Sequence, residues 1–285
     1  MKLTADTTAV VIGGGGGIGR GTALGLAAHG VRCVIADIEL DTAQAVAAEL
    51  VAAGTEAIAV RVDATDVDSL TELAERAEAR FGAVHVLSNN VGVIVDAPLL
   101  EASEQQWGWV IEFNLMTIVR SCAVLVPRIQ AHGQGGHVVN TASMAALFAS
   151  TPEQVGGVRL GLYTTTKHAI LGYSETLRGE LAPDGIGVSC LCPGMVDSNL
   201  MATSLRNRPQ RYGGAEAAGD TAGLIPGAMA QEDVGPFVVA GIEQDRLHIL
   251  THPAESRAII ERRAAALGAD LDAYDEVARN QEERS

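Results

Sequence analysis

The amino-acid sequence predicts an α/β fold, a doubly wound parallel sheet of about seven strands with helices on both faces. Short, almost wholly apolar runs alternate with longer amphipathic runs, which is typical of strands buried on both faces and joined by covering helices. The composition agrees, because 32 glycines and an aromatic content of 4% suit an Ala-, Gly- and Val-rich α/β protein. We expect a single domain that covers residues 1–285.

We expect strands at the shortest and most continuous apolar runs, and helices at the longer amphipathic runs between them. The expected strands are residues 9–12, 31–37, 56–63, 84–90, 136–143, 185–194 and 246–252. The expected helices are residues 18–30, 41–54, 66–82, 103–131 and 162–182. Gly30 and Gly54 end the first two helices, and Asp66 is the expected N-cap of the third.

Two segments near the C-terminus depart from this alternation. Residues 198–232 are rich in Gly, Ala, Arg and Pro and are long for a connection, so we expect them to form a lid over the substrate. Residues 255–285 are charged and have the pattern of a helical tail.

Charge and cysteine content narrow the class of function. The net charge of −15 disfavours nucleic acids and anionic membranes as partners, since both are negatively charged. The start, MKLTADTT, does not resemble a signal peptide, and no apolar run reaches the length of a membrane span. The four cysteines lack the spacing of a zinc site and are expected to be buried thiols. We therefore predict a cytoplasmic protein without a metal.

A glycine-rich loop separates the first strand from the first helix. The run VVIGGGGGIGRGTAL fits two dinucleotide-binding patterns, with glycines at 13, 17 and 19 or at 14, 16 and 19. Glycines here let the backbone approach a diphosphate, which the free N–H groups and the dipole of the helix attract. A flexible linker is the alternative, and the flanking strand and helix disfavour it.

Asp37 ends the second strand, 18 residues after Gly19. A dinucleotide-binding fold places a carboxylate at this point to bind the ribose hydroxyls of adenosine. Because a carboxylate repels a 2′-phosphate, Asp37 favours NAD over NADP. Arg20 and Arg32 argue the other way, but neither lies at the tip of the strand. A plain turn or N-cap role for Asp37 is the alternative.

The segment YTTTK contains the residues expected to carry the chemistry. Tyr163 and Lys167 are four residues apart and so share one face of a helix. An ammonium group beside a phenol is expected to lower the pKa of the phenol from its reference value of about 10. Tyr163 is then a candidate general acid and base near neutral pH. Taken alone, such a pair is more often a surface feature.

Further motifs accompany these residues in a fixed order. They are the glycine loop, Asp37, NNVG at 89–92, NTAS at 140–143, YTTTK at 163–167 and PGMVDS at 193–198. This set, from about residue 10 to 198, strongly resembles the short-chain dehydrogenase/reductase family. The resemblance implies a Rossmann-like sheet, a nicotinamide cofactor and a small alcohol or ketone as substrate. It also implies a homodimer or homotetramer formed through the helices at 103–131 and 162–182.

The resemblance implies roles for individual residues. Tyr163 would exchange a proton with the substrate, and Lys167 would lower the pKa of Tyr163. Ser143 would donate a hydrogen bond to the substrate oxygen. Asn114 would hold a water that links Lys167 to solvent. The implied cofactor-binding residues are Gly13, Gly16, Gly17, Ile18, Gly19, Asp37, Asp63, Ala64, Asn90, Gly92, Tyr163, Lys167, Pro193, Gly194, Val196 and Ser198.

Structural roles are the alternatives for the polar residues in this set. Ser143 can cap a helix, Asn114 can kink one, and Asn90 can form a turn. Ser143 and Tyr163 are 20 residues apart, which is more than is usual for the family. Residues 150–159 therefore resemble an insertion near the substrate entrance, and a displaced Ser143 would lose its role.

The substrate is the least determined feature. The segments expected to surround it, residues 93–99, 144–160 and 198–232, are mostly apolar, which favours a hydrophobic or aromatic secondary alcohol or its ketone. SLRNRPQRYGG at 204–214 is similar to a segment of dehydrogenases that oxidise benzylic alcohols of aryl ethers. The arginines of that segment can bind a carboxylate or form a solvated basic stretch.

Two other functions remain open. One is a non-catalytic, dinucleotide-binding sensor, which the complete set of Asn114, Ser143, Tyr163 and Lys167 disfavours. The other is an NADP-linked reductase of the ketoacyl type, which Asp37 disfavours.

Overall fold

A computed structural model describes residues 1–149, 151, 157–198, 200–215 and 227–282, apart from the side chain of residue 276. Among these residues, seven strands form one parallel sheet in the order β3-β2-β1-β4-β5-β6-β7. The strands are β1 (Thr8–Ile12), β2 (Arg32–Asp37), β3 (Ala57–Arg61), β4 (Val86–Asn89), β5 (Gly136–Thr141), β6 (Ile186–Cys192) and β7 (His248–Leu250). The predicted fold class is confirmed.

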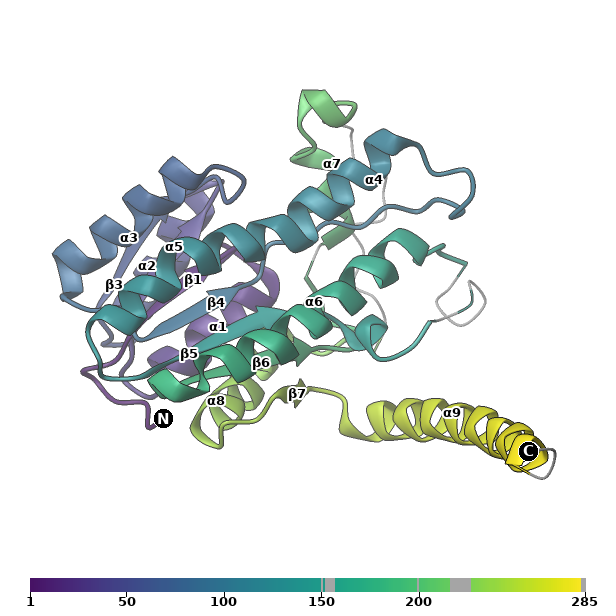
Figure 1. Ribbon diagram of the computed structural model, residues 1–285. Coiled ribbons are helices and arrows are strands. Elements are labelled where there is room, and N and C mark those ends of the chain that lie inside the picture. Colours follow the sequence, from purple (N-terminus) through teal and green to yellow (C-terminus); the bar gives the residue numbers. More distant parts are fainter. Residues whose placement is uncertain (150, 152–156, 199, 216–226, 283–285) are drawn as a thin grey trace. The chain divides into compact units, whose positions relative to one another are not determined.

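Helices cover both faces of the sheet, as parallel strands require. Figure 1 shows α5 and α6 crossing in front of the sheet, with α1 behind it, where α1 packs against α8. The α-helices described within residues 1–251 are α1 (Gly17–Ala27), α2 (Leu40–Ala52), α3 (Val67–Phe81), α4 (Glu104–Ile111), α5 (Thr117–Ala131), α6 (Gly161–Leu181), α7 (Leu200–Arg206) and α8 (Gly235–Glu243). Asp66 caps α3 as predicted, because its side chain accepts a hydrogen bond from the Asp68 N–H at 3.0 Å.

The strand order reverses between β1 and β4. From β1 the chain moves outward through β2 to β3, and it then returns to the other side of β1 with β4. Loops that leave the carboxyl ends of β1 and β4 therefore diverge, and they open a crevice between them. The topology of the sheet alone therefore predicts a ligand site at this crevice.

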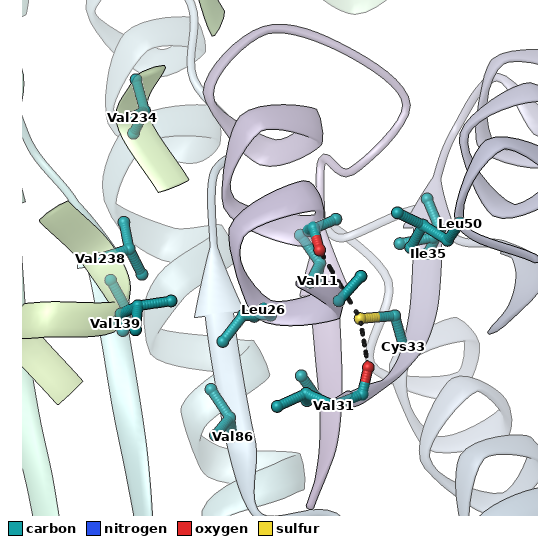
Figure 2. Packing of buried hydrophobic residues seen from close by; sticks show 14 of the residues in the cluster. Val11, Leu26, Val31, Cys33, Ile35, Leu50, Val86, Val139, Val234 and Val238 are labelled. Carbon is teal, nitrogen blue, oxygen red and sulfur yellow. Dashed lines mark hydrogen bonds between the residues drawn. The ribbon is translucent and has the colours of Figure 1, made fainter. Parts of the chain in front are cut away.

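The core behind the sheet consists of aliphatic side chains from both layers. Leu26 of α1 packs with Val11 and Val86 of the central strands, and Val238 of α8 packs with Val139 of β5 (Figure 2). The Cys33 thiol is buried here and lies 3.3 Å from the Val31 carbonyl oxygen. All four cysteines are free and buried, as expected.

The expected helix over 103–131 contains an irregular turn. A π-helical turn, Glu112–Met116, separates α4 from α5 and carries the buried Asn114. By length and composition, the stretch Glu104–Ala131 is apolar enough to cross a membrane, so the expectation that no apolar run reaches that length is wrong. Half of its apolar window is buried inside the fold, and the core helix of a soluble protein passes the same test.

Contacts within the chain define two compact units, Met1–Thr251 and His252–Ser285. The second unit contains one long helix, α9 (Pro253–Glu282), where a helical tail was expected. Most of the side chains described for α9 are exposed. The single-domain organisation stays a prediction.

His137 on β5 is buried in a neutral form. Its Nε2 lies 2.7 Å from the hydroxyl of Ser189 on β6, and that hydroxyl donates its hydrogen to the Arg246 carbonyl oxygen. The Ser189 oxygen can therefore only accept from His137. Burial lowers the pKa of His137 to about 3, with Asp245 opposing the shift and Arg178 and the N-terminus adding to it.

We expect His137 to make the folded state less stable in mild acid. Between its folded pKa of about 3 and the ordinary value of about 6.5, the unfolded chain binds a proton that the folded chain does not. At pH 5 the loss of unfolding free energy from this residue is about 2 kcal/mol relative to pH 7. Denaturant unfolding of the parent and of His137→Gln at both pH values measures this loss of unfolding free energy. His29→Gln, at an exposed site, is the control. An identical pH dependence in parent and His137→Gln would contradict it.

Candidate active site

A cavity of about 720 Å³ lies at the carboxyl ends of the strands, on both sides of the reversal in strand order. Its walls are the glycine loop, the residues that follow β2, β3 and β4, the first turns of α6, and α7. The predicted site residues on these walls are Gly13, Gly16, Gly17, Ile18, Gly19, Asp37, Asp63, Ala64, Asn90, Gly92, Tyr163, Lys167 and Ser198. Segments far apart in the sequence therefore meet at one cavity.

The glycine loop turns tightly from β1 into α1. The N–H groups of Gly13 and Gly14 donate to the Ala36 carbonyl oxygen at 2.8 and 3.1 Å, which ties the loop to β2. Gly13 and Gly17 have φ angles of 71° and 53°, a region that side chains disfavour. No side-chain hydrogen bond caps the start of α1. Its first N–H groups are thus available to an anion.

Asp37 is fixed beside this loop by two backbone donors. Its Oδ2 accepts from the Gly15 N–H at 2.9 Å, and its Oδ1 accepts from the Glu39 N–H at 3.1 Å. Burial raises the pKa of Asp37, and the two backbone hydrogen bonds act in the opposite direction. The carboxylate therefore lines the cavity in a fixed orientation and retains lone pairs for a ligand hydroxyl.

Asp63 and Asn90 hold the turns after their strands. Asp63 Oδ1 accepts from the N–H and the hydroxyl of Thr65 at 2.9 and 2.7 Å. Asn90 donates to the Ile12 carbonyl oxygen at 3.1 Å and accepts from the Thr141 hydroxyl at 2.8 Å. The turn-forming role expected as the alternative for Asn90 is thus present, together with a place on the cavity wall.

Tyr163 and Lys167 lie on one face of α6, as their spacing predicts. Lys167 Nζ is 5.2 Å from the centre of the Tyr163 ring and donates to the Thr141 carbonyl oxygen at 2.9 Å. Burial lowers the pKa of Lys167 to about 8 and raises the pKa of Tyr163 to about 12. The expected lowering of the Tyr163 pKa is therefore not found, because burial of the phenol outweighs its hydrogen bond with Ser143.

Ser143 lies beside Tyr163 despite the long segment between them. A hydrogen bond with Ser143 lowers the pKa of Tyr163, against the effect of burial. Ser143 Oγ also accepts from the Ala145 N–H at 3.1 Å, so it caps a short 3₁₀ turn, η2 (Met144–Ala146). Most of the expected insertion, 150 and 152–156, lies outside the described residues.

The other predicted residues lie behind the walls of the cavity. Asn114 is fully buried and hydrogen-bonds the backbone of Val93 and the hydroxyl of Thr166. The Pro193 carbonyl oxygen accepts from the Met144 N–H at 2.9 Å. Gly194 and Val196 follow in the same segment and do not line the cavity, whereas Ser198 does. The described part of the chain holds no cluster of residues suited to a metal ion.

A contact across the cavity was not anticipated from the sequence. Arg206 at the end of α7 pairs with Glu39 at 2.9 Å, and Asn207 donates to the same carboxylate at 3.0 Å. All three residues line the cavity. Arg206 is thus engaged by a carboxylate within the protein, and the segment that was expected to form a lid is joined to the start of α2. The arginine was singled out in the sequence, but its partner is 167 positions away and carries no motif.

Comparisons with known proteins identify the family. The family model for short chain dehydrogenases matches residues 7–209. "Probable oxidoreductase EphD" of Mycobacterium tuberculosis is 35% identical over 82% of this chain, and the chain spans 38% of that protein's length. "1-deoxy-11-beta-hydroxypentalenate dehydrogenase" of Streptomyces exfoliatus is 34% identical over 86% of this chain and 82% of its own length. "C alpha-dehydrogenase" of Sphingobium sp. strain SYK-6 is 29% identical over 94% of this chain and 87% of its own.

Solved structures agree with these relatives. A short-chain dehydrogenase/reductase from Burkholderia phymatum, solved in complex with NAD, superposes with a TM-score of 0.80 at 31% identity, covering 91% of this chain and 93% of the other. The resemblance to the short-chain dehydrogenase/reductase family is confirmed. The matched region covers the glycine loop, Tyr163 and Lys167, and the chain belongs to the short-chain dehydrogenase family.

Proposed function

We propose that this protein is an NAD-dependent enzyme that interconverts a hydrophobic or aromatic secondary alcohol and its ketone. The observation that carries the proposal is one continuous cavity with the glycine loop and Asp37 at one part of its wall and Tyr163 and Lys167 at another. An anion site, a ribose-binding carboxylate and a proton-transfer group thus share a single space.

The walls fit a nicotinamide dinucleotide. A side chain at Gly19 would overlap the Gly13 carbonyl oxygen, and one at Gly17 would come within 3.1 Å of Ser198. The loop is therefore formed by backbone, and its N–H groups are suited to hold a diphosphate. Asp37 would hold the adenosine ribose, and Lys167 would reach the second ribose. When bound, the cofactor supplies hydride acceptance or donation.

Residues of the chain would accept and donate the proton of the reaction. In alcohol oxidation the Tyr163 phenolate would take the hydroxyl proton, and in ketone reduction the phenol would return it. A pKa of about 12 keeps the phenol protonated at neutral pH, which suits the reductive direction. Lys167, held at the Thr141 carbonyl oxygen, favours the phenolate by its charge, and Ser143 adds a hydrogen bond.

Apolar side chains support a hydrophobic substrate. Val93, Phe113 and Leu200 line the cavity, and Val93 belongs to a buried cluster with Trp109 and Leu162. Two relatives are named as dehydrogenases of a hydroxypentalenate and of a Cα position, which agrees with a bulky substrate. We propose that the segment 198–232 covers this substrate, although 199 and 216–226 lie outside the described residues. A cytoplasmic homodimer or homotetramer stays a prediction.

Substitution of Tyr163 by Phe is expected to lower kcat about 1,000-fold, because it removes the proton-transfer group and keeps the ring. Activity is measured as NADH absorbance at 340 nm with a panel of secondary alcohols graded by size and aromaticity. Tyr173→Phe, the same change on the same helix, is the matched control and is expected to retain activity. Full activity in Tyr163→Phe would refute the mechanism, and NADH binding without turnover by the parent would indicate a sensor.

The rate of ketone reduction is expected to fall above about pH 8. Lys167 is charged below its pKa of about 8 and loses its proton above it, so its support of the phenolate is lost as the pH rises. The profile of kcat/KM from pH 6 to 10 shows this limb, with NADH affinity measured at each pH as the control. A profile that is flat to pH 10 would contradict the assignment.

Asp37→Ala is expected to weaken NADH binding by about tenfold or more and to abolish the preference for NADH over NADPH. The substitution removes two hydrogen-bond acceptors and the charge that repels a 2′-phosphate. Fluorescence titration with both reduced cofactors measures the effect, and Asp41→Ala, an exposed site in α2, is the control. Equal affinities of the parent for NADH and NADPH would instead support the NADP-linked reductase.

A further inference from the structure

Asn114 is held by three hydrogen bonds from two different parts of the fold. Its Oδ1 accepts from the Val93 N–H at 2.6 Å, and its Nδ2 donates to the Val93 carbonyl oxygen at 3.0 Å. The second hydrogen of Nδ2 goes to the Thr166 hydroxyl, also at 3.0 Å. Both hydrogens of the amide are therefore used, and the side chain has one orientation.

Thr166 is the partner that joins Asn114 to α6. Its hydroxyl has a single hydrogen, which it donates to the Tyr163 carbonyl oxygen at 2.9 Å. Toward Asn114 the hydroxyl can therefore only accept, so it requires the amide nitrogen on that side. Thr166 is 2% exposed, so water cannot replace this hydrogen bond unless the structure changes. It directly precedes Lys167 in the sequence.

The contact relates Asn114 to the proton-transfer residues. An atom at the β-carbon position of Gly92 would lie 3.4 Å from Asn114 Oδ1 and 3.6 Å from Lys167 Nζ. The amide oxygen and the ammonium thus border the same point of the cavity wall. Val93 fixes Asn114 to the loop after β4, and only Thr166 fixes it to the helix of Tyr163 and Lys167 among the hydrogen bonds found in the described residues.

We propose that Thr166 is a positioning residue, which holds Asn114 in register with Tyr163 and Lys167 through its hydroxyl. The inference rests on the proposed function and adds a residue to it. Asn114 lies in the π-helical turn Glu112–Met116, a geometry that is rare and often occurs at functional sites. The Thr166 hydroxyl and the Val93 backbone hold that turn against α6 and against the loop after β4.

The test compares two neighbouring threonines of α6. Thr166→Val removes the hydroxyl and keeps the branched shape, whereas Thr166→Ser keeps the hydroxyl. Thr165 is the matched control, because its hydroxyl also donates to a backbone carbonyl, that of Gly161 at 2.9 Å, but the side chain is exposed. We expect kcat to fall about tenfold in Thr166→Val, with the KM for NAD within about twofold. The pH profile of kcat shifts in the same variant.

Four further comparisons separate positioning from general damage. Thr166→Ser restores kcat and the pH profile, and Thr165→Val leaves both unchanged. Thr166→Val binds NADH as the parent does in a fluorescence titration. In Asn114→Ala, the added Thr166→Val change has no further effect on kcat, because the two residues act as a unit.

Several outcomes would overturn the inference. They are an unchanged kcat and pH profile in Thr166→Val, a Thr166→Ser variant as impaired as Thr166→Val, or additive effects with Asn114→Ala. If Tyr163→Phe is inactive while Thr166→Val is fully active, this inference fails and the proposed function stands. If Tyr163→Phe is fully active, the proposed function fails first.

Discussion

The site depends on how closely the first turn of α1 approaches the end of β1. Gly19 lies against the carbonyl oxygen of Gly13, where no side chain fits. This approach brings the uncapped start of α1 to the carboxyl end of the sheet, where the strand order reverses. The crevice and the start of α1 then coincide, which is the geometry that our proposal of a bound diphosphate requires.

A second constraint is the burial of the two side chains that we propose for proton transfer, Tyr163 and Lys167. Lys167 is buried and Tyr163 is half-buried in the cavity wall, and burial favours the uncharged form of each group. The phenol and the ammonium therefore shift in opposite directions from their ordinary pKa values, to about 12 and about 8. Burial therefore separates two pKa values that are ordinarily close together, and it favours a neutral phenol beside a lysine that titrates near pH 8.

The polar residues around this pair connect elements rather than simply line the cavity. Asn114 joins the π-helical turn to the loop after β4 and to α6, and Lys167 joins α6 to the end of β5. On the far side of the cavity, Arg206 and Asn207 join α7 to Glu39. Each connection is a side-chain hydrogen bond between segments that are distant in sequence, so the geometry of the proposed site is a property of the assembled sheet.

Sequence patterns alone were enough to predict the class of fold, the glycine loop, the position of Asp37 at the end of β2 and the shared face of Tyr163 and Lys167. These features follow from local periodicity and spacing, which neighbouring residues fix. Four features became visible in the folded chain alone. They are the raised pKa of Tyr163, the contact of Ser143 with Tyr163, the partners of Asn114 and the pairing of Glu39 with Arg206. Burial and long-range hydrogen bonds depend on which distant segments meet, and no spacing in the sequence records that.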